Sequence, residues 1–229
     1  MRRSDIEQVR SLPLFREMTK THFSTLMSAA LLQKFPARTV LIREGELPDF
    51  LHIVVEGTVE LYSRWEDRET TIDIIRPVTT FILAAVIQDD VYLKSARTID
   101  AARILMIPSE AIRDIFGRDA GFARAIVSEL ALRYRGIVRV LKDRKLRTSV
   151  ERLANWILAM DRSEGGGGRI VLAHDKRTLS SRLGMTPENL SRSLAILGDH
   201  GVEGTGREIV IVDREALQRC AKPSPLIDG

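Results

Sequence analysis

The sequence has almost no cysteine and no long hydrophobic run, and these two absences exclude several classes of protein. Cys220 is the single cysteine among 229 residues, so the chain cannot form an internal disulfide. This fits a reducing cytoplasm, where we expect the protein to reside. No apolar run approaches the roughly 18 residues that span a bilayer, and the N-terminal segment MRRSDIEQVR lacks the apolar stretch of a signal peptide. We therefore expect no membrane as a partner.

Patterns that carry catalysis or bind metals are also scarce. The histidines are scattered along the chain without metal-ligand spacing: His22, His52, His174 and His200. No serine or cysteine stands in a pattern that suggests an activated nucleophile, and the glycine run at 165–168 does not follow a strand as a phosphate-binding loop would. The sequence therefore predicts that the protein is not an enzyme.

What remains is the composition of an ordinary globular protein with an uneven distribution of charge. Hydrophobic residues make up 44% of the chain and charged residues 29%, which suits one large domain or two modest ones. The net charge is only +4, but the range 118–147 holds nine basic and three acidic residues. This basic helix either attracts the phosphates of a nucleic acid or is simply a solvated charged face.

The stretch KRTLSSRLGMTPENLSRSLAILG, residues 176–198, predicts two helices joined by a tight turn. Leu179 and Leu183 lie on one face of a short first helix, which Gly184 ends. Thr186 is the expected N-cap of a second helix, and Pro187 occupies its first position, where the missing N–H costs nothing. Two helices with such a turn are typical of a helix-turn-helix.

The second helix of this pair divides into a buried stripe and an outward face. The stripe is formed by Leu190, Leu194 and Leu197. Glu188, Ser191 and Arg192 lie off it, where a recognition helix enters the major groove. An arginine pairs with guanine O6 and N7, a glutamate accepts from cytosine N4, and a serine serves either role. The alternative is that Glu188 complements the helix dipole and pairs with Arg192.

Other residues of the pair are expected to contact DNA as well. Lys176 and Arg177, at the start of the first helix, are placed for phosphates. Thr186 and Asn189, at the start of the second helix, complete the predicted DNA-binding set.

The first half of the chain predicts a small antiparallel barrel or sandwich behind two short helices. Segments such as TVLIREG, DFLHIVVEG, TVELYSRW and TTIDIIRP are short, rich in β-branched residues and separated by turns. Gly45 and Gly57 are the expected turn glycines. The segment ARTIDAARILMIP adds one or two strands that end at Pro108.

A long helix follows, from Asp119 to about Leu146, and it carries a heptad seam. The apolar residues of the seam step by 3, 4, 3 and 4: Val127, Leu130, Tyr134, Ile137 and Leu141. We expect this seam to be the interface of a homodimer. The alternative is that it packs against the barrel of its own chain.

The last part of the chain predicts a winged helix. A helix over 148–160 is followed by the glycine run, a strand RIVLAHD at 169–175, the helix-turn-helix, and a turn plus strand GVEGTGREIVIVD that forms the wing. Asp213 is the expected cap of a last helix, and we expect the Pro-containing tail after it to be loose. The predicted fold class is α+β, with domains at 1–117, 118–147 and 148–229.

This order of elements resembles the CRP/FNR superfamily of bacterial transcription regulators across nearly the whole chain. The most specific match is LGMTPENLSRSLAILGDHGV followed by GREIVIVD, and REGELPDFLHIVVEGTVEL is similar to the β-roll of the family's effector domain. The resemblance implies a cyclic-nucleotide-binding-like β-roll, a dimerisation helix and an FNR-type reading head. It also implies a TTGAT-like half-site read by Glu188, Ser191 and Arg192, and RNA polymerase as a partner.

Two departures limit what the resemblance implies about an effector. FNR itself holds an iron–sulfur cluster, which wants about four thiolates, so a single cysteine excludes that cofactor. In the cyclic AMP receptor, a Gly-Glu pair and an Arg-Ser pair hold ribose and phosphate. The corresponding positions here are Leu83, Ala84, Lys94 and Ser95.

These replacements predict an effector pocket that disfavours cyclic AMP. Ala84 cannot accept from a ribose hydroxyl, although Lys94 and Ser95 can still touch a phosphate. Phe81 begins an apolar run through Ile87, which suits haem or another apolar small molecule. The alternative is that this run merely closes the barrel with no ligand. His52, on a predicted strand, is a candidate ligand of haem iron, as in haem-bearing relatives of the family, and the alternative is a packed or surface histidine.

The sequence as a whole predicts a sequence-specific DNA-binding transcription regulator, modulated by an effector at the β-roll. The alternative is a ligand-binding regulatory module that acts through protein contacts. The outward groups of Glu188 and Arg192 favour the first, because a protein-docking face has no need of groups matched to base edges.

Overall fold

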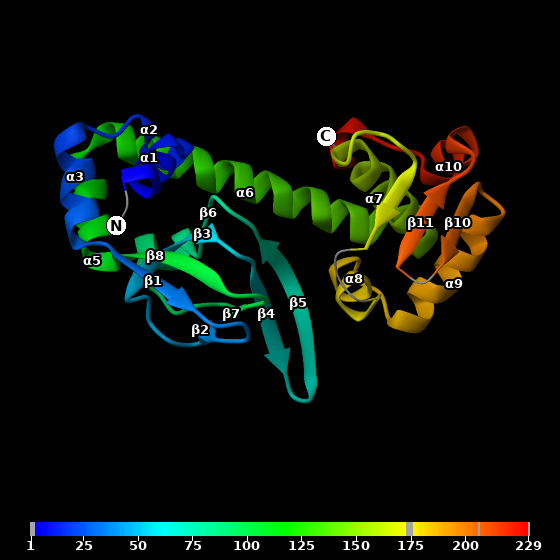
Figure 1. The fold of residues 1–229 in the computed structure, drawn as a ribbon, viewed down its shortest axis with the longest axis horizontal. Helices are drawn as coiled ribbons and strands as arrows, with labels where there is room; N and C mark the ends of the chain where they lie inside the picture. The colour runs from blue at the N-terminus through cyan, green and yellow to red at the C-terminus, as the bar shows by residue number, and fades with distance from the viewer. Residues whose placement is uncertain (1–2, 173–175, 206, 229) are drawn as a thin grey trace. The chain divides into compact units, whose positions relative to one another are not determined.

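A computed structural model describes residues 3–172, 176–205 and 207–228 of the chain (Figure 1). Its contacts divide the chain into an N-terminal unit, Met1–Arg133, and a C-terminal unit, Tyr134–Gly229. The long helix α6, Ala120–Leu146, contributes residues to both units. The two units are described separately below.

The N-terminal unit is built on two four-stranded sheets in which all neighbouring strands are antiparallel. One sheet has the order β1-β8-β3-β6 and the other has the order β2-β7-β4-β5. The strands are β1 Leu31–Phe35, β2 Val40–Ile42, β3 Phe50–Glu56, β4 Val59–Trp65, β5 Arg68–Ile75, β6 Thr79–Phe81, β7 Ser95–Thr98 and β8 Ala102–Pro108. The predicted turn glycines Gly45 and Gly57 both have positive φ, +87° and +83°.

The helices of this unit cover one sheet, and β3 is therefore buried on both faces. They are α1 Arg3–Ser11, α2 Pro13–Arg16, α3 Lys20–Ala29, α4 Leu83–Gln88 and α5 Ser109–Arg118. Leu51 and Ile53 of β3 pack in the core that these helices form with the start of α6, whereas Val54 belongs to the core between the two sheets. This double burial explains why the strand reads as a continuous apolar run. Figure 1 shows α1, α2 and α3 gathered near α5 at one end of the unit.

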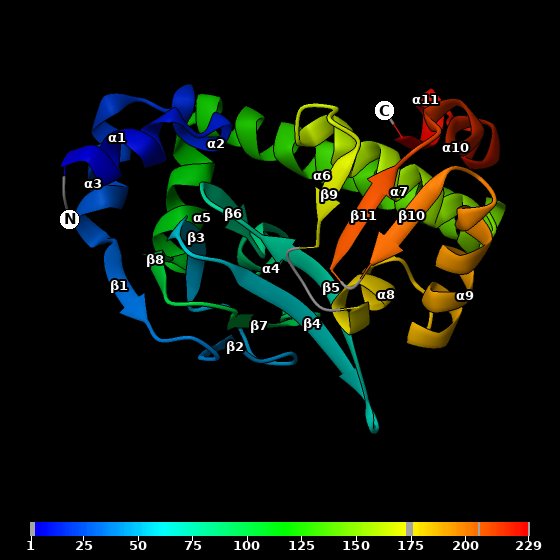
Figure 2. The same cartoon turned by 45° about the vertical axis from the view of Figure 1, so that its right-hand side comes forward.

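The C-terminal unit is a winged helix with its own core. The order of its three-stranded antiparallel sheet is β10-β11-β9, visible as three neighbouring strands in Figure 2. Besides the end of α6, its elements are α7 Ser149–Ser163, β9 Arg169–Val171, α8 Lys176–Arg182, α9 Pro187–Gly198, β10 Val202–Thr205, β11 Glu208–Ile211, α10 Arg214–Ala221 and α11 Pro225–Asp228. Its core joins α7, α9 and the sheet through Leu153, Ile157, Leu190, Leu197 and Ile209.

The structure corrects three of the expectations from sequence. The tail after α10 is not loose, because it forms α11 and Asp228 is held by Arg147. The run from Phe81 to Ile87 is not one continuous wall of the barrel: β6 ends at Phe81 and α4 begins at Leu83. The strand expected at 169–175 ends at Val171, and residues 173–175 lie outside the described residues.

Candidate nucleic-acid interface and effector region

The helix-turn-helix is formed by α8 and α9 with the local signals that the sequence predicts. Gly184 adopts a positive φ of +62° in the turn, and the backbone N–H of Met185 donates to the carbonyl of Ser180 at 3.0 Å. The hydroxyl of Thr186 accepts from the N–H of Asn189 at 3.2 Å, and Pro187 is the first residue of α9. The predicted N-cap and turn are therefore confirmed.

Helix α9 buries one stripe and exposes the face that was predicted to read bases. Leu190 and Leu197 are fully buried, and Leu194 is half-buried against the same core. Glu188, Ser191 and Arg192 are all exposed. The burial of the leucine stripe fixes the rotation of α9 about its axis, so these three polar side chains share the outward side.

The charged groups on this face do not form a close ion pair, although the charge of Arg192 contributes to lowering the pKa of Glu188. Among the described residues, no ion pair within 4.0 Å joins Glu188 to Arg192 or to any other residue. A hydrogen bond from its own backbone amide, and then one from the Thr186 hydroxyl, lowers the pKa of Glu188. The carboxylate is therefore ionised at neutral pH, which suits an acceptor for an amino group on a base.

The remaining residues of the predicted DNA-binding set divide into two groups. Lys176 and Arg177 are exposed at the start of α8, as a phosphate contact requires. Thr186 and Asn189 are engaged within the unit: Thr186 caps α9, and the hydroxyl of Ser149 donates to the Asn189 side-chain oxygen at 3.4 Å. The structure thus brings the start of α7 next to α9.

Two arginines that the sequence did not single out lie at the turn of the helix-turn-helix. A Cβ at Gly184 would lie 3.0 Å from Nε of Arg144, so the guanidinium of this α6 residue sits against the turn. Arg152 donates to the carbonyl of Leu183 at 3.2 Å and to the carbonyl of Arg147 at 2.8 Å. Their basic character was visible in the sequence, but the partners are distant along the chain and carry no local signal.

The predicted effector residues are dispersed rather than gathered around one cavity. Phe81 and Leu83 are buried in different cores, the first between the sheets and the second under the helices. Ala84 is exposed on α4. The hydroxyl of Ser95 accepts from the backbone N–H of Glu44 at 3.0 Å, and Lys94 is half-buried. Burial is the main cause that lowers the pKa of the Lys94 ammonium.

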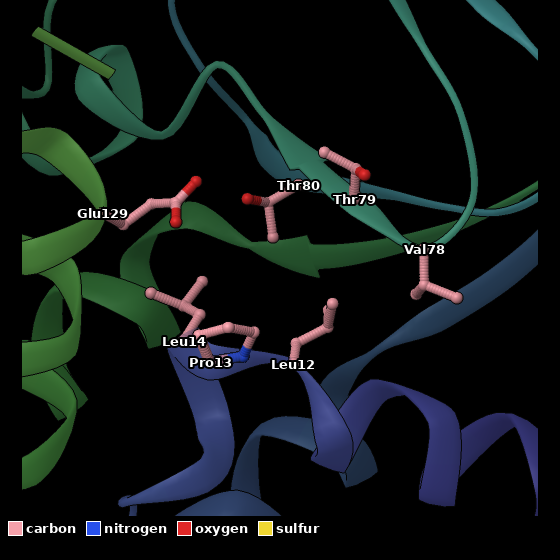
Figure 3. Close-up of a pocket in the computed structure, with 7 residues that line it drawn as sticks. All are labelled: Leu12, Pro13, Leu14, Val78, Thr79, Thr80 and Glu129. Atoms are coloured by element: carbon pink, nitrogen blue, oxygen red, sulfur yellow. The ribbon is translucent and has the colours of Figure 1, made fainter. Parts of the chain in front are cut away.

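A cavity of about 170 Å³ lies elsewhere in the N-terminal unit (Figure 3). Its lining comes from the α1–α2 junction, from Val78 and the start of β6, and from α6: Leu12, Pro13, Leu14, Val78, Thr79, Thr80 and Glu129. At its edge, Arg133 donates to the carbonyl of Thr80 and to Glu129, both at 2.8 Å. None of the five predicted effector residues lines this cavity.

His52 is a packed side chain in the core between the two sheets. It is only 3% exposed, its ring centroid lies 5.3 Å from that of Phe81, and its Nδ1 meets no described group in hydrogen-bond geometry. Burial lowers the pKa of His52 to about 4. These contacts favour the packed alternative over an iron ligand. Among the described residues, no group of three His, Cys, Asp or Glu side chains is arranged to hold a metal ion.

The predicted dimer seam leaves apolar side chains exposed along α6. Val127, Tyr134, Ile137 and Leu141 are 61%, 67%, 66% and 50% exposed. Leu130 differs, because it packs partly against the core of its own unit. The seam therefore consists of four outward residues and one that also serves the N-terminal unit.

A sensor-like β-roll, a long helix and a winged helix-turn-helix with an exposed polar reading face define a DNA-binding regulator with a sensor domain. The cyclic nucleotide-binding domain family matches residues 32–119, and the Crp-like helix-turn-helix domain family matches residues 151–220. The chain belongs to the CRP/FNR superfamily of transcription regulators. None of the described helices combines the length and the apolar character needed to cross a membrane.

Individual relatives agree with this assignment. The chain is 26% identical over 194 residues to the CRP-like cAMP-activated global transcriptional regulator of Mycobacterium tuberculosis, a match that covers 82% of this chain and 87% of the relative. The structure of FixK2 from Bradyrhizobium japonicum is similar with a TM-score of 0.70 at 23% identity, covering 85% of this chain and 98% of that one. A CooA variant from Carboxydothermus hydrogenoformans gives 0.71 at 16% identity, covering 86% and 90%. The last two similarities concern the fold alone.

Proposed function

We propose that this CRP/FNR-type regulator acts as a homodimer and reads an inverted repeat of TTGAT-like half-sites through Glu188, Ser191 and Arg192. The single observation that carries this proposal is the outward face of α9, where these three side chains are exposed while the leucine stripe is buried. Arg192 has the planar fork that pairs with guanine, and Glu188 is an ionised acceptor for cytosine N4. Lys176 and Arg177 contribute phosphate contacts that carry no sequence information.

The dimer follows from the exposed seam on α6. Large apolar side chains in heptad spacing on one helix are stable when a second copy covers them. A two-fold dimer presents two α9 helices to DNA, so the half-sites are inverted and about one helical turn apart. RNA polymerase is the further partner that this mode of action implies.

The effector is proposed to bind at the β-roll, and it is not cyclic AMP held in the usual way. The family's ribose-contacting positions are occupied by a buried Leu83 and by Ala84, whose methyl group offers no acceptor. The phosphate-contacting serine position is Ser95, whose hydroxyl oxygen accepts from the backbone N–H of Glu44, so that its O–H can still donate to a phosphate. The effector that these positions favour is an apolar small molecule rather than a nucleotide, and the packed His52 argues against haem. The relative from M. tuberculosis is described as cAMP-activated, and this proposal separates the chain from that relative.

The proposal is tested by fluorescence anisotropy with the full chain and three labelled duplexes at one moderate salt concentration. The first carries the inverted TTGAT repeat, the second carries one half-site, and the third is a scrambled sequence of the same composition. We expect the repeat to bind tightest and the scrambled duplex weakest. Equal affinity for the repeat and the scrambled duplex would contradict sequence reading, and equal affinity for the repeat and the half-site would contradict the dimer.

A further inference from the structure

The junction between α6 and α7 is held by a buried arginine that pairs with the segment after α10. Arg147 is the residue between the end of α6 at Leu146 and the N-cap of α7 at Thr148. Its side chain is only 6% exposed. The two terminal nitrogens of its guanidinium donate to the two carboxylate oxygens of Asp228, each at 2.6 Å. Such a two-point pair fixes orientation as well as distance.

The same arginine also connects this pair to the last turn of α6. It donates to Asp143 at 3.0 Å and to the carbonyl of Lys222 at 3.4 Å. Burial raises the pKa of Asp228, but the hydrogen bonds from Arg147 and from the backbone N–H of Ser224 together outweigh it, so that the pKa is lowered. The carboxylate therefore stays charged over the whole neutral range.

The segment 222–228 touches both sides of the junction. On the α6 side, the ammonium of Lys142 donates to the carbonyl of Leu226 at 3.2 Å. On the α7 side, Lys222 forms an ion pair with Glu151 at 2.9 Å. The side-chain amide of Asn155, also on α7, donates to the carbonyl of Ala221, where the segment begins. One short segment is thus bonded to two helices that meet at a break.

The junction is not a continuous helix: a capping box between Thr148 and Glu151 starts α7 there. Thr148 has ψ near 164°, so the helical hydrogen-bond ladder does not pass from α6 into α7. Besides this capping box, side-chain contacts that cross the break hold the end of α6 against the winged helix. Arg152 supplies one such contact, because it donates to the carbonyls of Arg147 and Leu183. The segment 222–228, which includes α11, supplies another through Asp228 and Arg147.

We propose that Asp228 is a positioning residue: through Arg147 it fixes the direction in which α6 leaves the reading head, and so selects one spacing between DNA half-sites. The inference rests on the proposed function, because only a dimer joined through α6 converts this direction into a distance between two α9 helices. If Asp228 is removed, the Arg147 cation loses its two-point partner in a buried position, and the junction relaxes.

The test uses the full chain with Asp228→Asn, beside a matched control, Glu215→Gln. Glu215 is a carboxylate on α10 whose side chain is 88% exposed and forms one long ion pair, 3.7 Å, with Arg219 of the same helix. Its loss should therefore leave the contacts of the junction unchanged. Binding is measured on duplexes whose half-sites stand at the preferred spacing, one base pair closer and one base pair farther, and on a single half-site. We expect wild type and Glu215→Gln to prefer one spacing by about tenfold or more, since one base pair rotates a half-site by about a tenth of a turn. Asp228→Asn should lose most of this preference while its affinity for the single half-site is unchanged.

A second measurement does not depend on DNA. Amide hydrogen exchange of residues 144–152 in the free protein should be faster in Asp228→Asn than in Glu215→Gln and wild type. Lys222→Gln removes the ion pair with Glu151 at a side chain that is 75% exposed, so we expect the variant to fold. It should change the exchange rates and the spacing preference in the same direction as Asp228→Asn, by a smaller amount. A folded Asp228→Asn protein with unchanged exchange and unchanged spacing preference overturns the inference. If wild type binds no repeat, the proposed function fails, and the exchange rates alone then decide whether Asp228 fixes the junction.

Discussion

At the scale of single residues, Arg192 shows how packing elsewhere decides what a side chain is free to do. The buried leucine stripe of α9 turns Arg192 outward, and no described carboxylate within 4.0 Å pairs with it. Its guanidinium donors are therefore available to a base edge without first breaking an ion pair.

We expect Arg192→Ala to weaken binding to the repeat by roughly 1–3 kcal/mol and to relax discrimination at one guanine. Lys176→Ala is the matched control, because the loss of a phosphate contact should weaken all duplexes alike and reduce the salt dependence. Competition binding with each base at the guanine position measures both effects. Arg192→Ala protein that still selects guanine as strongly as wild type would refute the assigned role.

His52 makes the N-terminal unit sensitive to acid. Its folded pKa of about 4 lies below the usual value of 6.5, so the unfolded chain binds the proton first as the pH falls. The free energy of unfolding should therefore decrease between about pH 6.5 and pH 4, by an amount on the order of 3 kcal/mol from this residue. Above pH 6.5 both states are neutral and the effect vanishes.

The apolar variant His52→Met should remove this part of the pH dependence. Urea denaturation of both proteins at pH 7.5, 6, 5 and 4, followed by a signal of the N-terminal unit, gives the difference. If the two curves of unfolding free energy against pH run parallel, the buried histidine does not titrate as described.

At the scale of elements, α6 is defined by a face that its own chain does not cover. The predicted seam places Ile137 close to the two-fold axis of the proposed dimer. Ile137→Glu would bring two like charges together among apolar neighbours, where burial without a partner is costly. We expect a monomer or a much weaker dimer, with DNA affinity lost although α9 is unchanged.

Leu132→Glu is a close control for this variant. Leu132 lies on the same helix and is 66% exposed, the same fraction as Ile137, but it is not part of the seam. Sedimentation equilibrium should therefore find Leu132→Glu dimeric. Equal dimer affinity of the two variants would show that the seam is assigned to the wrong face.

The elements also show what the sequence can and cannot predict. The starts of α9 and α10 follow from local signals, since Thr186 and Asp213 cap the residues that immediately follow them. The outward reading face follows from the period of the leucine stripe. The sequence did not predict α11, because the contact that holds it is distant along the chain: Asp228 pairs with Arg147, 81 residues earlier. Leu130 was placed wholly in the seam because periodicity does not show what the other side of a helix contacts.

At the scale of the whole molecule, the two units have separate cores, and they meet in sequence within α6. Helix α6 is therefore the covalent connection between the core of the N-terminal unit and that of the reading head. The effector proposed above is therefore tested on the N-terminal unit.

Cyclic nucleotides should neither bind this unit strongly nor tighten DNA binding. A ribose hydroxyl placed against Leu83 and Ala84 would lose water without gaining an acceptor, a cost of roughly 1–3 kcal/mol for each group. Lys94 keeps a positive charge but lacks the planar fork with which arginine holds a phosphate. Titration calorimetry with cyclic AMP and cyclic GMP, an absorption scan after addition of haem, and DNA binding with and without each compound test this expectation.

The double variant Ala84→Glu, Lys94→Arg provides the positive control, because it restores a ribose acceptor and a phosphate fork at exposed or half-buried positions. We expect the double variant to bind cyclic AMP more tightly than wild type. That result would show that Ala84 and Lys94 are aligned correctly with the family's motif. Micromolar binding of a cyclic nucleotide to the wild-type protein, together with tighter DNA binding, would show instead that other side chains of the β-roll replace the missing acceptor. In that case Arg133 is the first residue to substitute, because its guanidinium donates to Thr80 and Glu129, two residues that line the cavity in Figure 3.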